Sequence, residues 1–116
     1  MLNTQFSPWP SFTQQEADAV SRVLLSNKVN YWTGTETREF EKEYANWVGT
    51  DYAIALANGT LALDLALQAM GVGAGDEVIV TPRSFIASVS TVVNAGALPV
   101  FADVEEATGN ISARTI

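Results

Sequence analysis

The second half of the chain alternates between short apolar runs and longer segments with helical spacing. Apolar runs cover residues 52–57, 77–81 and 97–104, and the segments expected to form helices between them cover residues 60–70 and 84–94. Strands and helices that alternate in this order predict parallel strands joined by right-handed crossovers. Pro99 has no amide proton to donate, so we expect the last strand to lie at a sheet edge. The sequence therefore favours an α/β fold.

The first half of the chain predicts two helices. Thr13 and Glu16 have the spacing of a capping box, and apolar residues at helical intervals then predict a helix over residues 14–25. A second helix is predicted by an apolar stripe, and it is expected to end at Gly49. The stripe consists of Phe40, Tyr44, Trp47 and Val48. Between the two helices, "VNYWTGTE" indicates a loop with aromatic side chains.

The composition excludes several functions. A chain of 116 residues suggests one domain or part of a larger one. A net charge of −7, without a basic cluster, argues against binding to nucleic acid. The absence of cysteine and histidine excludes disulfides, zinc sites and Ser/His/Asp triads within this chain. Neither a secretion signal nor a membrane-spanning run is evident, so we expect a cytoplasmic protein without a membrane partner.

The junction at Asn58, Gly59 and Thr60 separates the first apolar run from the helix that follows. Glycine there allows a sharp turn and a close approach of the backbone to a ligand, and the unpaired amides of Thr60 and Leu61 would attract a phosphate. Alternatively, Asn58 or Thr60 simply caps the helix, which is a common role for both residue types.

Phe85 follows the second predicted strand, at the sheet edge where ligands of α/β proteins collect. Two roles are open to it. The ring stacks on a flat ligand, or it packs against the start of its helix as a hydrophobic staple.

These motifs together resemble the DegT/DnrJ/StrS family, the pyridoxal-phosphate-dependent sugar-nucleotide aminotransferases. The resemblance runs in order from "TGTETREFEKEYANWVG" through "ANGTLALDLALQAMGVGAGDEVIV" and "TPRSFIAS" to "FADVEEATGNIS". It implies that pyridoxal 5'-phosphate is bound by Gly59, Thr60, Leu61 and Phe85. It also implies that a loop containing Trp32, Thr33 and Gly34 borders the substrate pocket. Two positions depart from the family pattern: Arg83 replaces a small or aromatic residue, and Ser112, which replaces an acid, is expected to affect only surface contacts.

The resemblance implies a fold and a domain organisation. The fold is the three-layer α/β/α fold of type I pyridoxal-phosphate enzymes, with a mostly parallel sheet. Residues 1–116 would be the N-terminal segment of the large cofactor-binding domain, with helices and a loop in residues 1–50 and the start of the sheet in residues 51–116. The remainder of that domain and a small C-terminal domain would be absent. Because later strands separate the first strand from the other two in this fold, we expect residues 52–57 to re-pair, to associate with another copy, or to belong to a longer chain.

The function implied by the resemblance is transfer of an amino group, commonly from glutamate, to a nucleotide-linked keto sugar, within a homodimer. Such enzymes serve polysaccharide, lipopolysaccharide and antibiotic sugar biosynthesis. The Schiff-base lysine is not in this chain, because Lys28 and Lys42 are expected to be solvated surface charges, so these residues alone should be inactive. Two alternatives stay open: a sugar dehydratase of the same family that uses the same cofactor, and a non-catalytic α/β interaction module.

Overall fold

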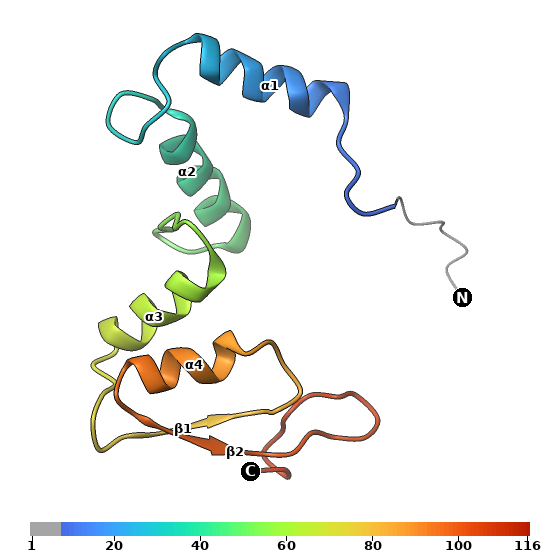
Figure 1. The fold of residues 1–116 in the computed structure, drawn as a ribbon, viewed down its shortest axis with the longest axis vertical. Coiled ribbons are helices and arrows are strands. Elements are labelled where there is room, and N and C mark those ends of the chain that lie inside the picture. Colours follow the sequence, from blue (N-terminus) through green and yellow to red (C-terminus); the bar gives the residue numbers. More distant parts are fainter. Residues whose placement is uncertain (1–7) are drawn as a thin grey trace. The chain divides into compact units, whose positions relative to one another are not determined.

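The computed structural model describes residues 8–116, and the chain divides into two compact units at residue 55 (Figure 1). Unit 1, residues 1–55, contains helices α1 (Gln14–Leu25) and α2 (Glu36–Val48). Unit 2, residues 56–116, contains α3 (Gly59–Ala69), β1 (Glu77–Val80), α4 (Ala87–Asn94) and β2 (Leu98–Phe101).

Helix α1 begins and ends where the sequence predicts, and α2 ends at the predicted glycine. The Thr13 side chain accepts a hydrogen bond from the Glu16 amide, and the Glu16 carboxylate accepts from the Thr13 amide at 2.7 Å, which completes the capping box of α1. Helix α2 ends at Gly49, which has the left-handed backbone conformation (φ 76°). Along α2 the rings of Phe40, Tyr44 and Trp47 follow one another at 5.8 and 5.6 Å between centroids.

Unit 2 is a parallel β-α-β unit with a second helix beside the crossover helix. Strands β1 and β2 pair in parallel, with Glu77 opposite Leu98 and Val80 opposite Phe101, as the alternating pattern predicts. Helix α4 contacts both strands and also α3. The buried core consists of Val80, Val92 and Ala97, with Leu67, Val72, Val78 and Val89 packed around it. In Figure 1, α3 and α4 run in the same direction and opposite to the strands, so both helices begin at the end of unit 2 where β1 and β2 finish.

The prediction of a strand over residues 52–57 is wrong. Residues 52–57 form neither strand nor helix, and the side chains of Tyr52 and Ile54 are 85% and 80% exposed. An extended segment becomes a strand only when another strand supplies partners for its amides and carbonyls. Among residues 8–116 the only sheet is the pair of β1 and β2. The expected re-pairing of this segment is therefore also absent.

Other elements of unit 2 differ in extent from the prediction. Helix α4 starts at Ala87 instead of residue 84, because the amides of Ser88 and Val89 bond three residues back and make a tighter first turn. Strand β2 is four residues long and shorter than the predicted 97–104 run, and β1 ends at Val80. Pro99 pairs opposite Val78 in a sheet with two outer strands, which fits its placement at an edge. Helix α3 has no fully buried residue within the described part of the chain.

A loop after β2 is organised by Glu105. Its carboxylate accepts hydrogen bonds from the Ser112 hydroxyl (2.6 Å) and from the Arg114 guanidinium. These bonds, with Arg114 as the larger cause, hold the pKa of Glu105 below its usual value. Ser112 was expected to affect only surface contacts, but it is half-buried and its hydroxyl donates to Glu105. Arg83 lies against Gly109, where its guanidinium occupies the space that a Cβ would need.

Candidate functional site

The start of α3 is capped by Asn58. Its side-chain oxygen accepts a hydrogen bond from the Leu61 amide at 3.0 Å, while its backbone is extended (φ −165°, ψ 168°). The capping interpretation of Asn58 is therefore confirmed, and Thr60 is inside the helix. It follows that the Leu61 amide, one of the predicted phosphate donors, already has a partner in this structure.

The donors left at this helix end are the amides of Gly59 and Thr60 and the Thr60 hydroxyl. Within the described part of the chain, none of these three groups donates a hydrogen bond to another residue. A Cβ placed on Gly59 would meet no atom within 4 Å, so open space adjoins the backbone at Gly59. Gly59 does not adopt a positive φ, so it does not make the sharp turn that the sequence suggested. What it offers a ligand is a backbone without a side chain. Two amides and a hydroxyl without a protein acceptor among residues 8–116, next to the open space at Gly59, fit an anionic group such as phosphate.

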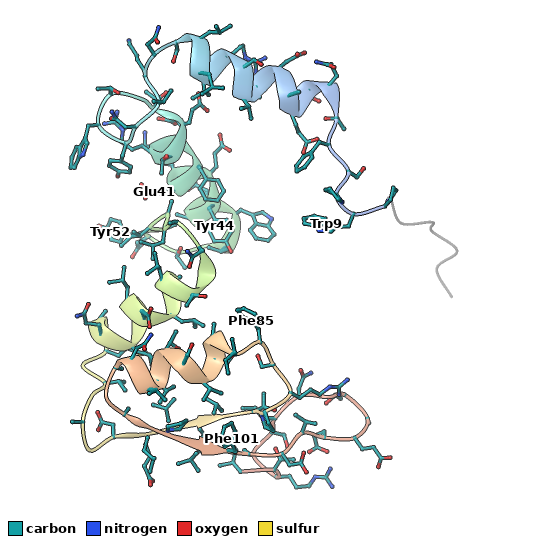
Figure 2. All side chains as sticks on the ribbon, in the orientation of Figure 1. Trp9, Glu41, Tyr44, Tyr52, Phe85 and Phe101 are labelled. Atoms are coloured by element: carbon teal, nitrogen blue, oxygen red, sulfur yellow. The ribbon has the colours of Figure 1, made fainter. Side chains whose placement is uncertain are left out.

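Phe85 lies in the loop between β1 and α4, at the start of α4 (Figure 2). Its side chain is 73% exposed. The position where a hydrophobic staple would find its apolar partner is occupied by Ser90, so the ring does not pack as a staple. Because α3 and α4 begin at the same end of unit 2, Phe85 and the donors of Gly59 and Thr60 belong to the same end of this unit (Figure 1).

The loop containing Trp32, Thr33 and Gly34 is folded around Asn30. The Asn30 side-chain oxygen accepts from the Trp32 amide (3.0 Å), the Thr33 amide (3.0 Å) and the Thr33 hydroxyl (3.1 Å). The Gly34 amide donates to the Asn30 carbonyl at 2.8 Å. The Trp32 ring is 84% exposed and meets Tyr31 edge-on at 5.6 Å. The loop is thus a preformed turn that presents Trp32 to solvent.

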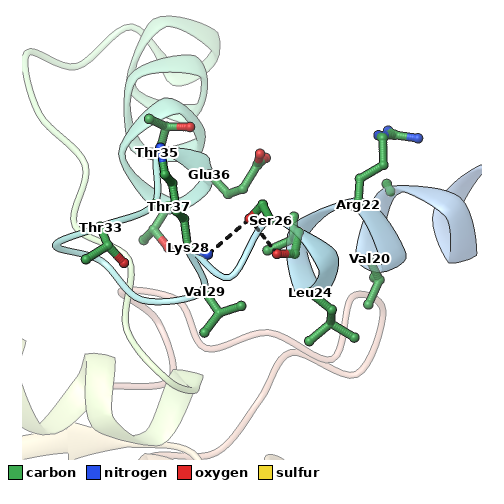
Figure 3. Close-up of a pocket in the computed structure, with 13 residues that line it drawn as sticks. Val20, Arg22, Leu24, Ser26, Lys28, Val29, Thr33, Thr35, Glu36 and Thr37 are labelled. Atoms are coloured by element: carbon green, nitrogen blue, oxygen red, sulfur yellow. Dashed lines mark hydrogen bonds between the residues drawn. The ribbon is translucent and has the colours of Figure 1, made fainter.

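A groove of about 780 Å³ lies in unit 1 between the second half of α1 and the start of α2 (Figure 3). Thr33 and Gly34 line it, whereas Trp32 does not. The groove also carries two cationic side chains, Arg22 and Lys28. The structure therefore brings two of the three predicted substrate residues to one concave surface.

Three residues of this region were missed by the sequence analysis: Asn30, Arg38 and Glu41. Asn30 has a recognisable signal, because asparagine often bonds to amides two and three residues ahead. Arg38 and Glu41 contact residues of the loop, and the hydrogen bond from the Tyr31 hydroxyl to Glu41 raises the pKa of that phenol. Nothing in the spacing of Arg38 and Glu41 along the sequence indicates these contacts.

The predicted surface position of the two lysines is consistent with the structure. Lys42 forms an exposed ion pair with Glu39 at 2.9 Å, and Lys28 is exposed, so both lysines are surface charges. In residues 8–116, no group of acidic side chains is arranged to hold a metal ion. The same residues contain no helix that is long and apolar enough to cross a bilayer.

Comparison with known proteins identifies the family. The DegT/DnrJ/EryC1/StrS aminotransferase family matches residues 10–116. The spore coat polysaccharide biosynthesis protein SpsC of Bacillus subtilis is 42% identical over 102 residues, which cover 88% of this chain and 26% of that protein. The chain thus spans about a quarter of the length of this relative.

Among the solved structures similar to this one are two aminotransferases. The aminotransferase from Psychrobacter cryohalolentis is 73% identical, with a TM-score of 0.92 over 96% of this chain and 28% of that protein. The pyridoxal-phosphate form of the sugar aminotransferase Spr1654 from Streptococcus pneumoniae is 37% identical, with a TM-score of 0.79 over 91% of this chain and 26% of that protein. Both are consistent with a piece of the type I fold. The chain belongs to the DegT/DnrJ/EryC1/StrS family of pyridoxal-phosphate-dependent aminotransferases.

Proposed function

We propose that the full-length protein carrying this sequence binds pyridoxal 5'-phosphate at the start of α3 and transfers an amino group to a keto sugar. The observation that carries the proposal is the pair of amides at Gly59 and Thr60 without an acceptor in the described part of the chain, with open space beside Gly59, at the end of unit 2 where Phe85 is exposed. When bound, this cofactor supplies an electron sink for transfer of an amine. The residues of this chain bind and orient it.

Gly59 and Thr60 hold the phosphate. Their amides point out of the first turn of α3, where the partial positive charge of the helix stabilises an anion by about 0.3–1 kcal/mol. The Thr60 hydroxyl adds a third donor, and the missing side chain of Gly59 allows the phosphate oxygens to reach the backbone. The Leu61 amide joins them only if the Asn58 side chain moves away from it.

Phe85 orients the pyridine ring. An exposed phenyl ring offers a flat apolar face, which excludes water from one side of a stacked aromatic ligand and limits its rotation. This role needs a planar aromatic side chain and no polar group.

Trp32, Thr33 and Gly34 contact the substrate. Their turn is held in shape by Asn30, and Thr33 and Gly34 line the groove of unit 1. A keto sugar acceptor is supported by the names of the relatives, one a polysaccharide biosynthesis protein and another a sugar aminotransferase. The nucleotide linked to that sugar, glutamate as donor and a homodimeric assembly are parts of the proposal supported by the family resemblance.

The domain organisation is proposed in the same way. Residues 1–50 supply helices and the substrate loop, and residues 51–116 begin the sheet of the cofactor domain. The exposed side chains of Tyr52, Ile54 and Leu56 support this division, because a strand at the start of a larger sheet needs partners from elsewhere in the protein.

The test uses the purified full-length protein. The expected result is a visible absorption band from bound pyridoxal phosphate. Addition of L-glutamate should replace this band with the band of the amine form of the cofactor. Replacing Thr60 with valine, which is similar in shape but lacks the hydroxyl, should weaken cofactor binding. A protein that binds the cofactor but accepts no amine from any amino acid would favour the dehydratase alternative, and one that binds no cofactor would refute the proposal and favour a non-catalytic module.

A further inference from the structure

Glu41 of α2 joins two segments that are distant in sequence. Its Oε2 accepts a hydrogen bond from the Tyr31 hydroxyl at 3.1 Å, and its Oε1 accepts from the Ala55 amide at 2.8 Å. The side chain is half-buried. Both carboxylate oxygens therefore accept a hydrogen bond, one from the proposed substrate loop (residues 31–34) and one from the segment after α2.

Arg38, one helical turn before Glu41, contacts the same loop at a second point. Its guanidinium donates to the Gly34 carbonyl at 2.6 Å and lies over the Tyr31 ring at 5.8 Å from the centroid. Position 34 accommodates only glycine, because a Cβ there would collide with the Lys28 carbonyl oxygen. Helix α2 thus holds the loop at its aromatic start and at its glycine end.

The bond to the Ala55 amide matters because residues 52–57 have no strand partner among the described residues. Glu41 supplies an acceptor for an amide that is half-buried in this segment. A buried amide without an acceptor is costly, so this bond fixes the backbone at Ala55. Three residues later the same chain reaches Asn58 and the proposed phosphate donors.

We propose that Glu41 is a positioning residue, which with Arg38 fixes both the substrate loop at Tyr31–Gly34 and the chain that leads into the phosphate-binding turn. The inference rests on the proposed function, since it assigns the consequence of these contacts to cofactor and substrate binding. Glu41 itself touches neither ligand. It acts through the Tyr31 hydroxyl and the Ala55 amide.

The experiment compares four variants of the full-length protein by hydrogen exchange of the peptides covering residues 31–34 and 52–57, and by titration with pyridoxal phosphate. Glu41→Ala removes both acceptors, so both peptides should exchange about tenfold faster, because hydrogen bonds to charged groups are the stronger ones. Pyridoxal phosphate should bind several-fold more weakly. Tyr31→Phe should accelerate only the loop peptide and raise the L-glutamate concentration that gives half-maximal conversion, without changing the maximal rate.

Two further variants separate positioning from general damage. Glu41→Gln keeps a carbonyl oxygen for the Ala55 amide and has an amide NH2 that can donate to the Tyr31 phenol oxygen, so it should restore exchange and cofactor affinity to within about twofold of the wild type. Lys42→Ala, which removes only the exposed ion pair to Glu39, should match the wild type in every measurement.

The outcomes decide between the two proposals. Unchanged exchange in Glu41→Ala overturns the inference, and so does faster exchange with unaltered affinity for pyridoxal phosphate and unaltered response to L-glutamate. If the wild-type protein itself binds no pyridoxal phosphate, the proposed function fails, and the contacts of Glu41 are then purely structural.

Discussion

Replacing Asn58 with aspartate separates the two functions of the α3 N-terminus, because the cap and the phosphate respond to charge in opposite ways. A carboxylate oxygen accepts the Leu61 amide as well as the asparagine oxygen does. The added negative charge also interacts favourably with the helix end, by about 0.3–1 kcal/mol. The unfolding free energy of Asn58→Asp should therefore be equal to or higher than that of the wild type.

Cofactor binding should change in the other direction. A charge of −1 at about 6 Å from a phosphate of about −2 in water costs ~1.4 kcal/mol by Coulomb's law. This is about a tenfold loss of affinity for pyridoxal phosphate. Fluorescence or absorbance titration of the full-length protein at low salt measures the affinity, and thermal unfolding without cofactor measures the stability. Asn58→Ser, which keeps a neutral cap, is the matched control and should bind as the wild type does. Equal affinity in the aspartate and serine variants would refute the phosphate site at α3.

Three further predictions concern single contacts. Phe85→Leu keeps an apolar side chain but loses the flat ring, so we expect a several-fold weaker binding of pyridoxal phosphate, whereas Phe85→Tyr should bind normally; equal affinities would exclude stacking. Thr13→Ala removes the cap of α1 and should lower the unfolding free energy by about 1 kcal/mol, while Thr13→Ser should have little effect in chemical denaturation. Because bonds from Arg114 and Ser112 depress the pKa of Glu105, their contribution to stability is present above the unfolded-state pKa and is lost as the pH falls through the folded one. The melting temperature of the wild type should thus fall more in acid than that of Glu105→Gln, and parallel pH profiles would contradict this.

The sequence predicted best those features that are decided within a few residues. The capping box of Thr13 and Glu16 needs only residues three positions apart, and Gly49 ends α2 through its own backbone conformation. The parallel pairing of β1 and β2 follows from one helix between two apolar runs.

The prediction failed where a partner far along the chain decides the structure. The apolar pattern of residues 52–57 expresses a preference for burial, but it carries no information on which strand supplies the hydrogen bonds. The same limit applies to Arg38 and Glu41, because Glu41 bonds to residues ten positions before and fourteen after it. At the start of α3 the composition indicated a helix end suited to phosphate, yet only the geometry shows that Asn58 already occupies the Leu61 amide.

The Asn58 side chain that caps α3 is also chemically unstable over time. Asparagine is thermolabile, and it loses its amide most readily before glycine, because a backbone nitrogen without a neighbouring side chain can reach the asparagine side-chain carbonyl. Asn58 and Gly59 form such a pair, and the bond to the Leu61 amide restrains the side chain only while α3 is folded. Ageing of a stored sample would thus convert the neutral cap to a carboxylate, and a gradual loss of cofactor affinity would then reflect spontaneous deamidation and not unfolding.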